Sequence, residues 1–430
     1  MRVVSEPTAG LSYVALSGYA LIGRAQAIRA VALSWLFTML SPAIAAETSF
    51  STVGRFLVLG AAIAAVLLRS RLARGRSETH NFVFATVLLG GGIVIHGLLF
   101  SSYPAVSVLK AVSWTATTAA MLAAWLGLGK EARSRLATDL FGGLTLLMVF
   151  SLPLLWSPLG YLRNGSGFQG ILNHPQVFGP TAALLGAWAI GTLVAQRRPS
   201  WAITVLVAAC LVLVLLSEAR TAGIALVLGV GGAVMMLPMM AGKPVNAIAP
   251  GIKSRRFVGL ASLAVVGMLA VGPALMDRIE SYLAKGTSSD TVVEAYYKSR
   301  GDLIVEMWGN IKTDPFRGIG FGVASNSSEM KVQRDPLFGL PVAAPIEKGV
   351  MPVAVLEELG APGLLVVAAW VVVLLRRSGR ENVAGLAVTL TALLVNMGEY
   401  VLFSTGGMGL LLIILIAWAA SAPRARRVPS

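Results

Sequence analysis

The 430-residue chain is short of charge, cysteine and histidine. Only 13% of its residues are charged and 56% are hydrophobic, whereas soluble domains carry about 25% charged residues. This composition excludes an ordinary soluble domain and indicates a single polytopic membrane domain over residues 1–430. Cys210 is the only cysteine, so no intrachain disulfide can form. His80 and His96 are isolated in the sequence, and we expect no metal site from them.

No cleavable leader is expected at the start of the chain. The first apolar stretch, residues 10–23, is short and is followed directly by Arg24. Because about 20 apolar residues are needed to cross a bilayer, we expect an interfacial or half-inserted helix here.

Twelve later apolar runs are long enough to cross a membrane, some of them only marginally. They centre on residues 27–46, 52–68, 82–100, 105–128, 138–156, 176–195, 200–217, 222–241, 257–275, 350–375, 383–402 and 405–421. We therefore predict an all-α protein with about twelve transmembrane helices.

Basic residues recur in alternate connections between these runs. They lie within residues 69–76, 130–135, 197–198, 243–256, 376–380 and 424–427. Because cytoplasmic loops are enriched in Lys and Arg, this pattern predicts a membrane protein with both termini in the cytoplasm, which in a bacterium places it in the inner membrane. The net charge of +15 is then a topology signal, and no nucleic-acid partner is needed to explain it.

One long polar segment, residues 276–349, interrupts the apolar sequence between the ninth and tenth runs. It holds nine Lys and Arg against ten Asp and Glu, a net charge of 9 − 10 = −1. The alternation places it on the face opposite the basic connections. We therefore predict a large periplasmic loop.

Several ionisable residues lie toward the same predicted outer face. Arg55 and Lys110 either snorkel to the headgroups or line a polar cavity. Glu357 and Glu358 lie about 10 Å inside the tenth run, at 1.5 Å per residue. Their short side chains cannot snorkel far, so we expect both of them, and Glu399, to face a hydrated crevice.

Four motifs follow one another on these outer positions, in residues 167–176, 216–223, 299–322 and 347–363. They contain a Ser-x-x-Arg turn, an Arg…Trp…Pro-x-x-Gly-x-Gly-x-Gly loop and a Glu-Leu-Gly-x-x-Gly span. In this order they resemble the O-antigen ligase and polymerase superfamily of bacterial envelope glycosyltransferases. The resemblance covers residues 140–375.

The resemblance implies a twelve-helix, C-type glycosyltransferase fold with a large periplasmic loop. Such enzymes move glycan from an undecaprenyl-diphosphate-linked donor to a glycan or lipid acceptor hydroxyl. They use no nucleotide sugar, cofactor or catalytic metal. Arg220 matches the family's arginine at the outer turn, and Arg300 matches the arginine in the loop.

The chemistry of arginine agrees with these assignments. Its planar, permanently charged fork binds phosphate oxygens bidentately and stabilises charge that develops on a leaving diphosphate. Two plainer roles stay open. Arg220 could be a headgroup anchor or pair with Glu218, and Arg300 could lie on the solvated face of a loop helix.

The chain departs from the ligase pattern just before the tenth run. Ligases carry a histidine-asparagine pair there, whereas this chain reads Ile346-Glu347-Lys348-Gly349. Glu347 is the candidate general base for the acceptor hydroxyl, with a helix-start carboxylate as the alternative. Lys348 is a candidate diphosphate or sugar contact. The missing histidine favours a polymerase slightly, although the sequence does not separate polymerase from ligase.

Further candidate substrate contacts are Arg163, Glu218, His174 and Gly320. His174 precedes Pro175, so we expect it mainly to shape the helix start, with sugar contact as the less favoured role. Gly320 belongs to a glycine-rich turn that follows no βαβ strand, which excludes a nucleotide-binding loop and favours a turn where backbone meets substrate.

Two further expectations concern the apolar runs. The run Gly90-Gly91-Gly92 should allow close helix packing. The rival function is a transporter or flippase of lipid-linked glycans, which needs a polar path through both leaflets. The cytoplasmic halves of the runs are almost uncharged, which argues against such a path.

Overall fold

The computed structural model describes residues 6–45, 51–69, 78–270, 292–326, 328, 330–334, 341–343, 348–380 and 382–421. Nearly all of the regular structure in these ranges is helical, because backbone groups in lipid must find their partners within the chain. The exception is a short antiparallel pair of strands, β1 (Gln333–Arg334) and β2 (Pro341–Ala343).

Seven helices are long and apolar enough to cross a membrane, which confirms a polytopic membrane architecture. They are α3 (Ser51–Arg69), α4 (Glu78–Phe100), α5 (Pro104–Leu126), α6 (Lys130–Ser151), α7 (Pro175–Ala195), α9 (Arg220–Ala241) and α14 (Met351–Ser378). Each coincides with one of the twelve expected runs.

The other five runs form helices shorter than expected in the described ranges. They are α2 (Arg24–Met39), α8 (Trp201–Leu216), α11 (Arg255–Ala270), α15 (Val383–Val395) and α16 (Gly407–Ala420). Within the described residues, seven helices have the length of a full span, and the number of about twelve stays a prediction. The first apolar stretch does form a 17-residue helix, α1 (Glu6–Ile22).

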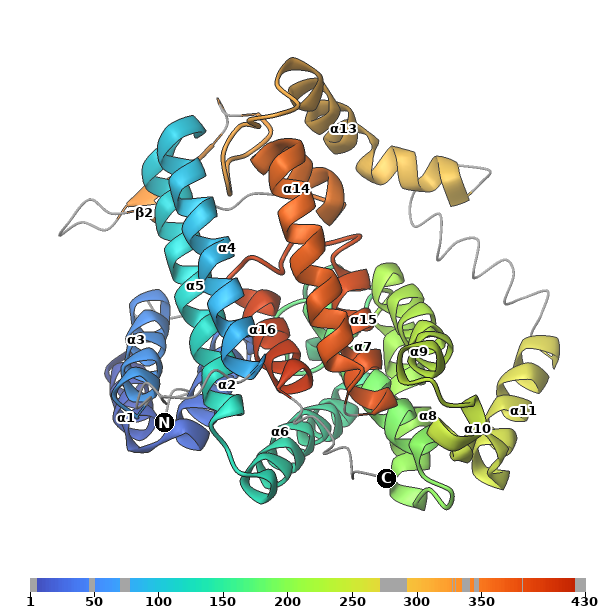
Figure 1. The fold of residues 1–430 in the computed structure, drawn as a ribbon. Helices are drawn as coiled ribbons and strands as arrows, with labels where there is room; N and C mark the ends of the chain where they lie inside the picture. The colour runs from blue at the N-terminus through green and yellow to red at the C-terminus, as the bar shows by residue number, and fades with distance from the viewer. Residues whose placement is uncertain are drawn as a thin grey trace.

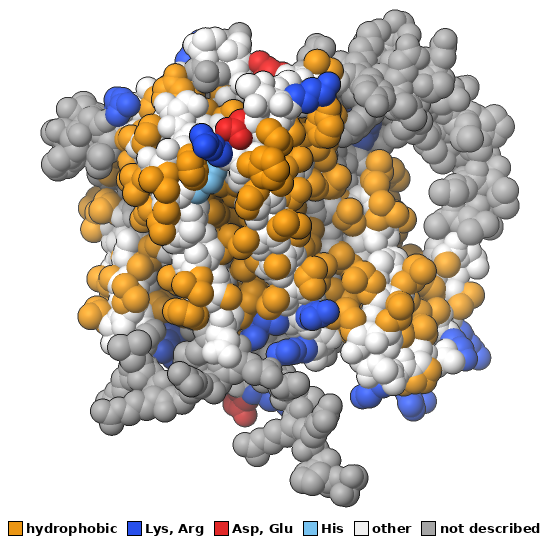
Figure 2. Space-filling model, turned by 45° about the horizontal axis from the view of Figure 1, so that its top comes forward, with side chains coloured by type: hydrophobic (Ala, Val, Ile, Leu, Met, Phe, Trp, Pro, Cys, Tyr) orange, Lys and Arg blue, Asp and Glu red, His pale blue; other side chains and the backbone are white. Residues whose placement is uncertain are grey.

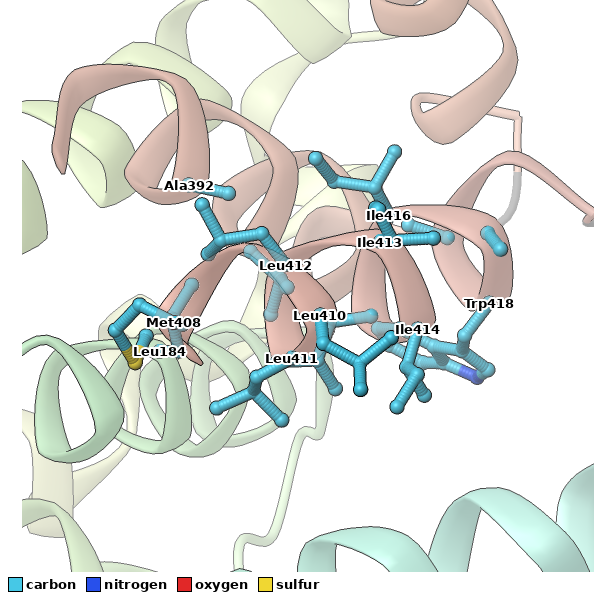
Figure 3. Packing of buried hydrophobic residues seen from close by; sticks show 14 of the residues in the cluster. Leu184, Ala392, Met408, Leu410, Leu411, Leu412, Ile413, Ile414, Ile416 and Trp418 are labelled. Carbon is cyan, nitrogen blue, oxygen red and sulfur yellow. The ribbon is translucent and has the colours of Figure 1, made fainter. Parts of the chain in front are cut away.

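The helices α7, α15 and α16 form the centre of the bundle (Figure 1). Side chains all around α16, from Met408 to Trp418, are buried against their neighbours (Figure 3). Small residues bring these helices close together. A Cβ atom at Gly191 in α7 would collide with the backbone of Ala384 in α15.

Basic side chains gather at one end of the bundle, the lower end in Figure 2, which we call the basic end. Several of them bind the C-terminal carbonyls of helices, where cations are favoured. The Arg133 Nη2 atom donates to the Trp418 carbonyl at 2.8 Å, and the Arg377 Nε atom donates to the Ala420 carbonyl at 3.1 Å. These arginines therefore stabilise the C-terminal end of α16, and they also belong to the basic connections that predict the orientation of the protein in the membrane.

The opposite end carries α13 (Val292–Thr313), which packs against α14, and we call it the loop end (Figure 1). The helices α15 and α16 stop short of it. With 13 residues, α15 is about 20 Å long at 1.5 Å per residue, against about 30 Å for a bilayer core.

The connection between them, residues 396–406, therefore lies below the loop end, and we call it the recessed loop. The Asn396 side chain holds it together, because its Oδ1 atom accepts from the backbone N–H groups of Val401 at 2.9 Å and Leu402 at 2.7 Å. Irregular backbone at this depth is tolerated only inside protein or against a water-filled space. The expected runs 383–402 and 405–421 are thus corrected to two short helices with this loop between them.

Candidate functional site

The helix α14 is broken near the loop end. Gly360 has φ 65° and ψ −178°. Pro362 has no N–H, so it cannot donate to the carbonyl of Glu358, four residues earlier. The glycine-rich turn, residues 318–322, supplies the missing donor: the Gly320 N–H binds the Glu358 carbonyl at 3.0 Å. The turn therefore completes the hydrogen bonding of a broken membrane helix.

The three glycines of this turn all have positive φ angles, which favour glycine. A Cβ atom at Gly320 would collide with Ser101 in the α4–α5 connection, and one at Gly322 would collide with the side chain of Lys110 in α5. The turn is thus wedged between α5 and α14. Gly320 was predicted to contact substrate, but the structure commits its N–H to protein and gives it a packing role.

A buried ion cluster lies beside the break. The Lys348 Nζ atom lies 2.7 Å from Glu357 Oε2 and 3.2 Å from Glu358 Oε1, and all three side chains are 0% exposed. The Tyr400 hydroxyl donates to Glu358 Oε2 at 2.9 Å, and the Asn310 amide donates to Glu357 Oε1 at 2.7 Å. These contacts join α13, α14 and the recessed loop.

The expectation that Glu357 and Glu358 face a hydrated crevice is therefore wrong. The chain folds Lys348 back between them, and the Tyr400 N–H bonds to the Lys348 carbonyl at 3.2 Å. Paired with lysine and hydrogen-bonded, the carboxylates tolerate burial. Lys348 was predicted to contact the donor, but its ammonium group is occupied within the cluster.

Lys110 supplies the fourth charge of the cluster. Its Nζ atom lies 5.3 Å from the ring centre of Phe321 and 5.7 Å from that of Tyr400, close enough for cation–π attraction. Glu358 attracts it electrostatically. Two lysines thus balance two glutamates, and the cluster is formally neutral.

A second polar group forms where residues 157–174 pack on the turn before α9. The Phe168 N–H bonds to the Leu216 carbonyl at 2.8 Å, and the Ser166 hydroxyl donates to Glu218 Oε2 at 3.0 Å. Glu218 has φ 53°, a left-handed conformation that is unusual for glutamate. The fold holds this carboxylate at the loop end, two residues before Arg220 begins α9.

Two other predicted contacts belong to this second group. His174 caps α7, since its Nδ1 atom accepts from the Gln176 N–H at 3.0 Å, so the predicted role in shaping the helix start is confirmed. Arg163 is exposed, and its backbone N–H bonds to the Gln169 side chain at 3.0 Å.

The recessed loop connects the two polar groups. A Cβ atom at Gly398 would collide with the side chain of Thr221, the residue after Arg220, and two residues further on Tyr400 binds Glu358. The structure therefore brings the α9 turn close to the ion cluster. The backbone of Arg300 lies in α13, but its side chain and Glu347 lie outside the described residues.

An apolar groove runs between α4 and α14, with a volume of about 580 Å³. Gly92, Gly363 and other small residues are part of its lining, and Phe100 and Phe316 line it toward the loop end. Of the expected glycine run, only Gly90 packs closely, against Thr115 of α5, whereas Gly92 meets no atom within 4 Å. The sequence predictions missed this groove, and the small residues at positions 85 and 92 were its only signal.

The mouth of the groove is polar. The His96 Nε2 atom lies 2.5 Å from the Arg317 carbonyl oxygen, and the Arg317 guanidinium lies 5.6 Å from the Phe100 ring centre. In Figure 2, charged and histidine side chains lie at the upper border of the apolar face. The groove thus has an apolar lining and a guanidinium cation at its mouth.

Within the described residues, no group of His, Cys, Asp or Glu side chains could hold a metal ion. No protein-family model matches the chain, and no curated protein matches it. The residues and their geometry alone must therefore support a functional assignment.

Proposed function

We propose that the protein transfers or polymerises glycan from an undecaprenyl-diphosphate-linked donor onto an acceptor hydroxyl at the periplasmic face of the inner membrane. One observation carries the proposal: four polar segments, distant in sequence, meet at the loop end. They are residues 157–174, the turn before α9, the glycine-rich turn and the start of α14, and the recessed loop links them. A catalytic site for a lipid headgroup requires such a meeting at the border of the bilayer.

In this proposal Arg220 and Arg300 bind the diphosphate oxygens and stabilise the charge of the leaving group. Glu347 accepts the proton of the acceptor hydroxyl. Its neighbour Lys348 is fixed by Glu357 and Glu358. Glu347 directly precedes the anchored Lys348 in the sequence, which supports the choice of Glu347 as the base.

The test is a glycan-profile gel of a strain in which Arg220→Ala or Arg300→Ala replaces the wild-type protein. Both variants should lose the polymeric or ligated glycan at unchanged protein abundance. Arg198→Ala, at an exposed position of the basic end, is the matched control and should give a wild-type profile. Wild-type glycan in both site variants would remove the mechanism.

The same gel separates the two activities within the proposal. A lost polymerase leaves single-repeat product, whereas a lost ligase leaves bare acceptor and stranded lipid-linked glycan. Glu347→Gln should slow transfer while sparing donor binding, and unchanged turnover would assign the base to another group.

A second candidate function is transport of lipid-linked glycans, and the broken helix α14 favours it. Discontinuous helices beside intramembrane carboxylates are typical of carriers. The ion cluster lies toward one end, however, about 10 Å inside α14 at 1.5 Å per residue. Movement of labelled donor across liposomes without any glycosidic bond being formed would favour this candidate.

A further inference from the structure

We propose that the groove between α4 and α14 binds the hydrocarbon chain of a polyprenyl phosphate lipid, with its phosphate at Arg317. The choice of a polyprenyl lipid rests on the proposed function. The groove itself, its cation and its open side rest on the structure alone. Arg317 would be a substrate-binding residue that the sequence motifs do not indicate.

The groove exists because side chains are small where the two helices face each other. Gly92 and Ala85 on α4 and Gly363 and Ala369 on α14 are among the lining residues, and most of the others are leucine, isoleucine, valine and aromatic residues. Its rim opens toward lipid, since Leu88 is 59% exposed. An apolar trough open to the bilayer is filled by hydrocarbon, because no water is available there.

The mouth of the groove selects the headgroup. The Arg317 guanidinium stacks near Phe100, and within the described parts of the chain no carboxylate pairs with that guanidinium. His96, which also lines the groove, holds the Arg317 backbone at the mouth, because its Nε2 atom lies 2.5 Å from the Arg317 carbonyl oxygen. The Arg317 guanidinium can bind phosphate oxygens of a lipid whose chain occupies the trough.

The shape of the groove favours one chain over two. It is a single trough between two helices, whereas a diacyl phospholipid has a second chain that would be left outside. A polyprenyl phosphate has one long chain and one compact anionic head. The groove and its cation therefore fit this lipid better than a bulk phospholipid.

The experiment measures binding of undecaprenyl diphosphate and of uncharged undecaprenol to the purified full-length protein in detergent micelles, by native mass spectrometry. Gly92→Leu places a larger side chain in the trough at a position where an added Cβ atom meets nothing within 4 Å. The control is Gly91→Leu, an equally open position on the same helix that does not line the groove. Arg317→Gln removes the cation, and Lys312→Gln is the exposed control on α13.

Gly92→Leu should weaken the binding of both lipids by at least about tenfold, since each methylene contact that is lost lowers the affinity about fourfold. Gly91→Leu should leave binding within a factor of about two, which is a small change in free energy. Arg317→Gln should weaken the binding of undecaprenyl diphosphate about tenfold, because only the charged hydrogen bonds are lost. The binding of undecaprenol should stay unchanged. Lys312→Gln should affect neither lipid.

Wild-type affinity in Gly92→Leu and Arg317→Gln would overturn the groove assignment, and glycan transfer that depends on Arg220 would then still support the proposed function. If the two variants weaken lipid binding but the wild-type protein transfers no glycan, the groove assignment would be supported and the proposed function contradicted. A wild-type protein that binds neither lipid would overturn both.

Discussion

The buried ion cluster makes a sharp prediction about Lys348. Replacing Lys348 with methionine keeps the length of the side chain but removes the cation that lies 2.7 Å and 3.2 Å from two fully buried carboxylates. Glu357 and Glu358 would then face each other with Lys110 as the single remaining cation of the cluster. Removing one partner of a buried ion pair costs about 3–5 kcal/mol, because the other charge is left uncompensated.

A second substitution should restore much of this loss. In the double variant Lys348→Met with Glu357→Gln, the remaining carboxylate is Glu358, which keeps the Tyr400 hydroxyl and the electrostatic attraction of Lys110. The cluster is neutral again, so the double variant should be more stable than Lys348→Met alone by at least about 1 kcal/mol.

The assay is denaturant unfolding of the purified protein in mixed micelles, followed by tryptophan fluorescence. The matched control is Arg135→Met, which removes the cation of an exposed pair with Glu131, 3.8 Å apart. That change should alter the free energy of unfolding by less than about 1 kcal/mol, as exposed pairs do. If Lys348→Met is as mild as the control, the cluster does not anchor the loop end and the reasoning is refuted.

Three further substitutions test other parts of the fold. Gly360→Ala should lower the free energy of unfolding by about 1–3 kcal/mol, because the backbone there suits glycine alone and a Cβ atom would collide with the Phe316 carbonyl. A variant as stable as the wild-type protein would contradict the break in α14. Glu218→Gly should raise the free energy of unfolding by about 1 kcal/mol, because φ 53° favours glycine. The same change should lower glycan transfer, because the carboxylate is lost. A stabilised variant with full activity would show that Glu218 is not part of the site. Arg133→Met should lower the free energy of unfolding by about 1–3 kcal/mol, because it removes two buried hydrogen bonds, to the Trp418 carbonyl at 2.8 Å and to the Ser421 hydroxyl at 3.2 Å, and thermal unfolding in detergent measures the loss.

The long helices could be predicted from hydropathy because their burial in lipid depends on composition alone. The lengths of α15 and α16 could not, because apolar residues continue past the helix ends. What ends α15 is the Asn396 side chain, which binds the Val401 and Leu402 N–H groups of a loop folded back on itself. A hydropathy window counts Val401 and Leu402 as part of a span, whatever conformation they adopt.

The candidate site divides in the same way. Local motifs predicted the cap at His174 and the turn before α9 because their bonds join residues close in sequence. The ion cluster depends on Lys348 folding back onto Glu357 and Glu358, and the role of Gly320 depends on a carbonyl of α14. These are tertiary contacts, so the sequence alone could identify the polar residues but could not predict which of them contact each other.

The most direct test of the central claim is glycosidic bond formation by the purified protein in liposomes that contain an undecaprenyl-diphosphate-linked oligosaccharide and an acceptor. The account predicts that each new bond appears together with one released undecaprenyl diphosphate, and that Arg220→Ala abolishes both products while the protein stays folded. Absence of any new bond with the wild-type protein, or equal turnover by Arg220→Ala, would contradict it.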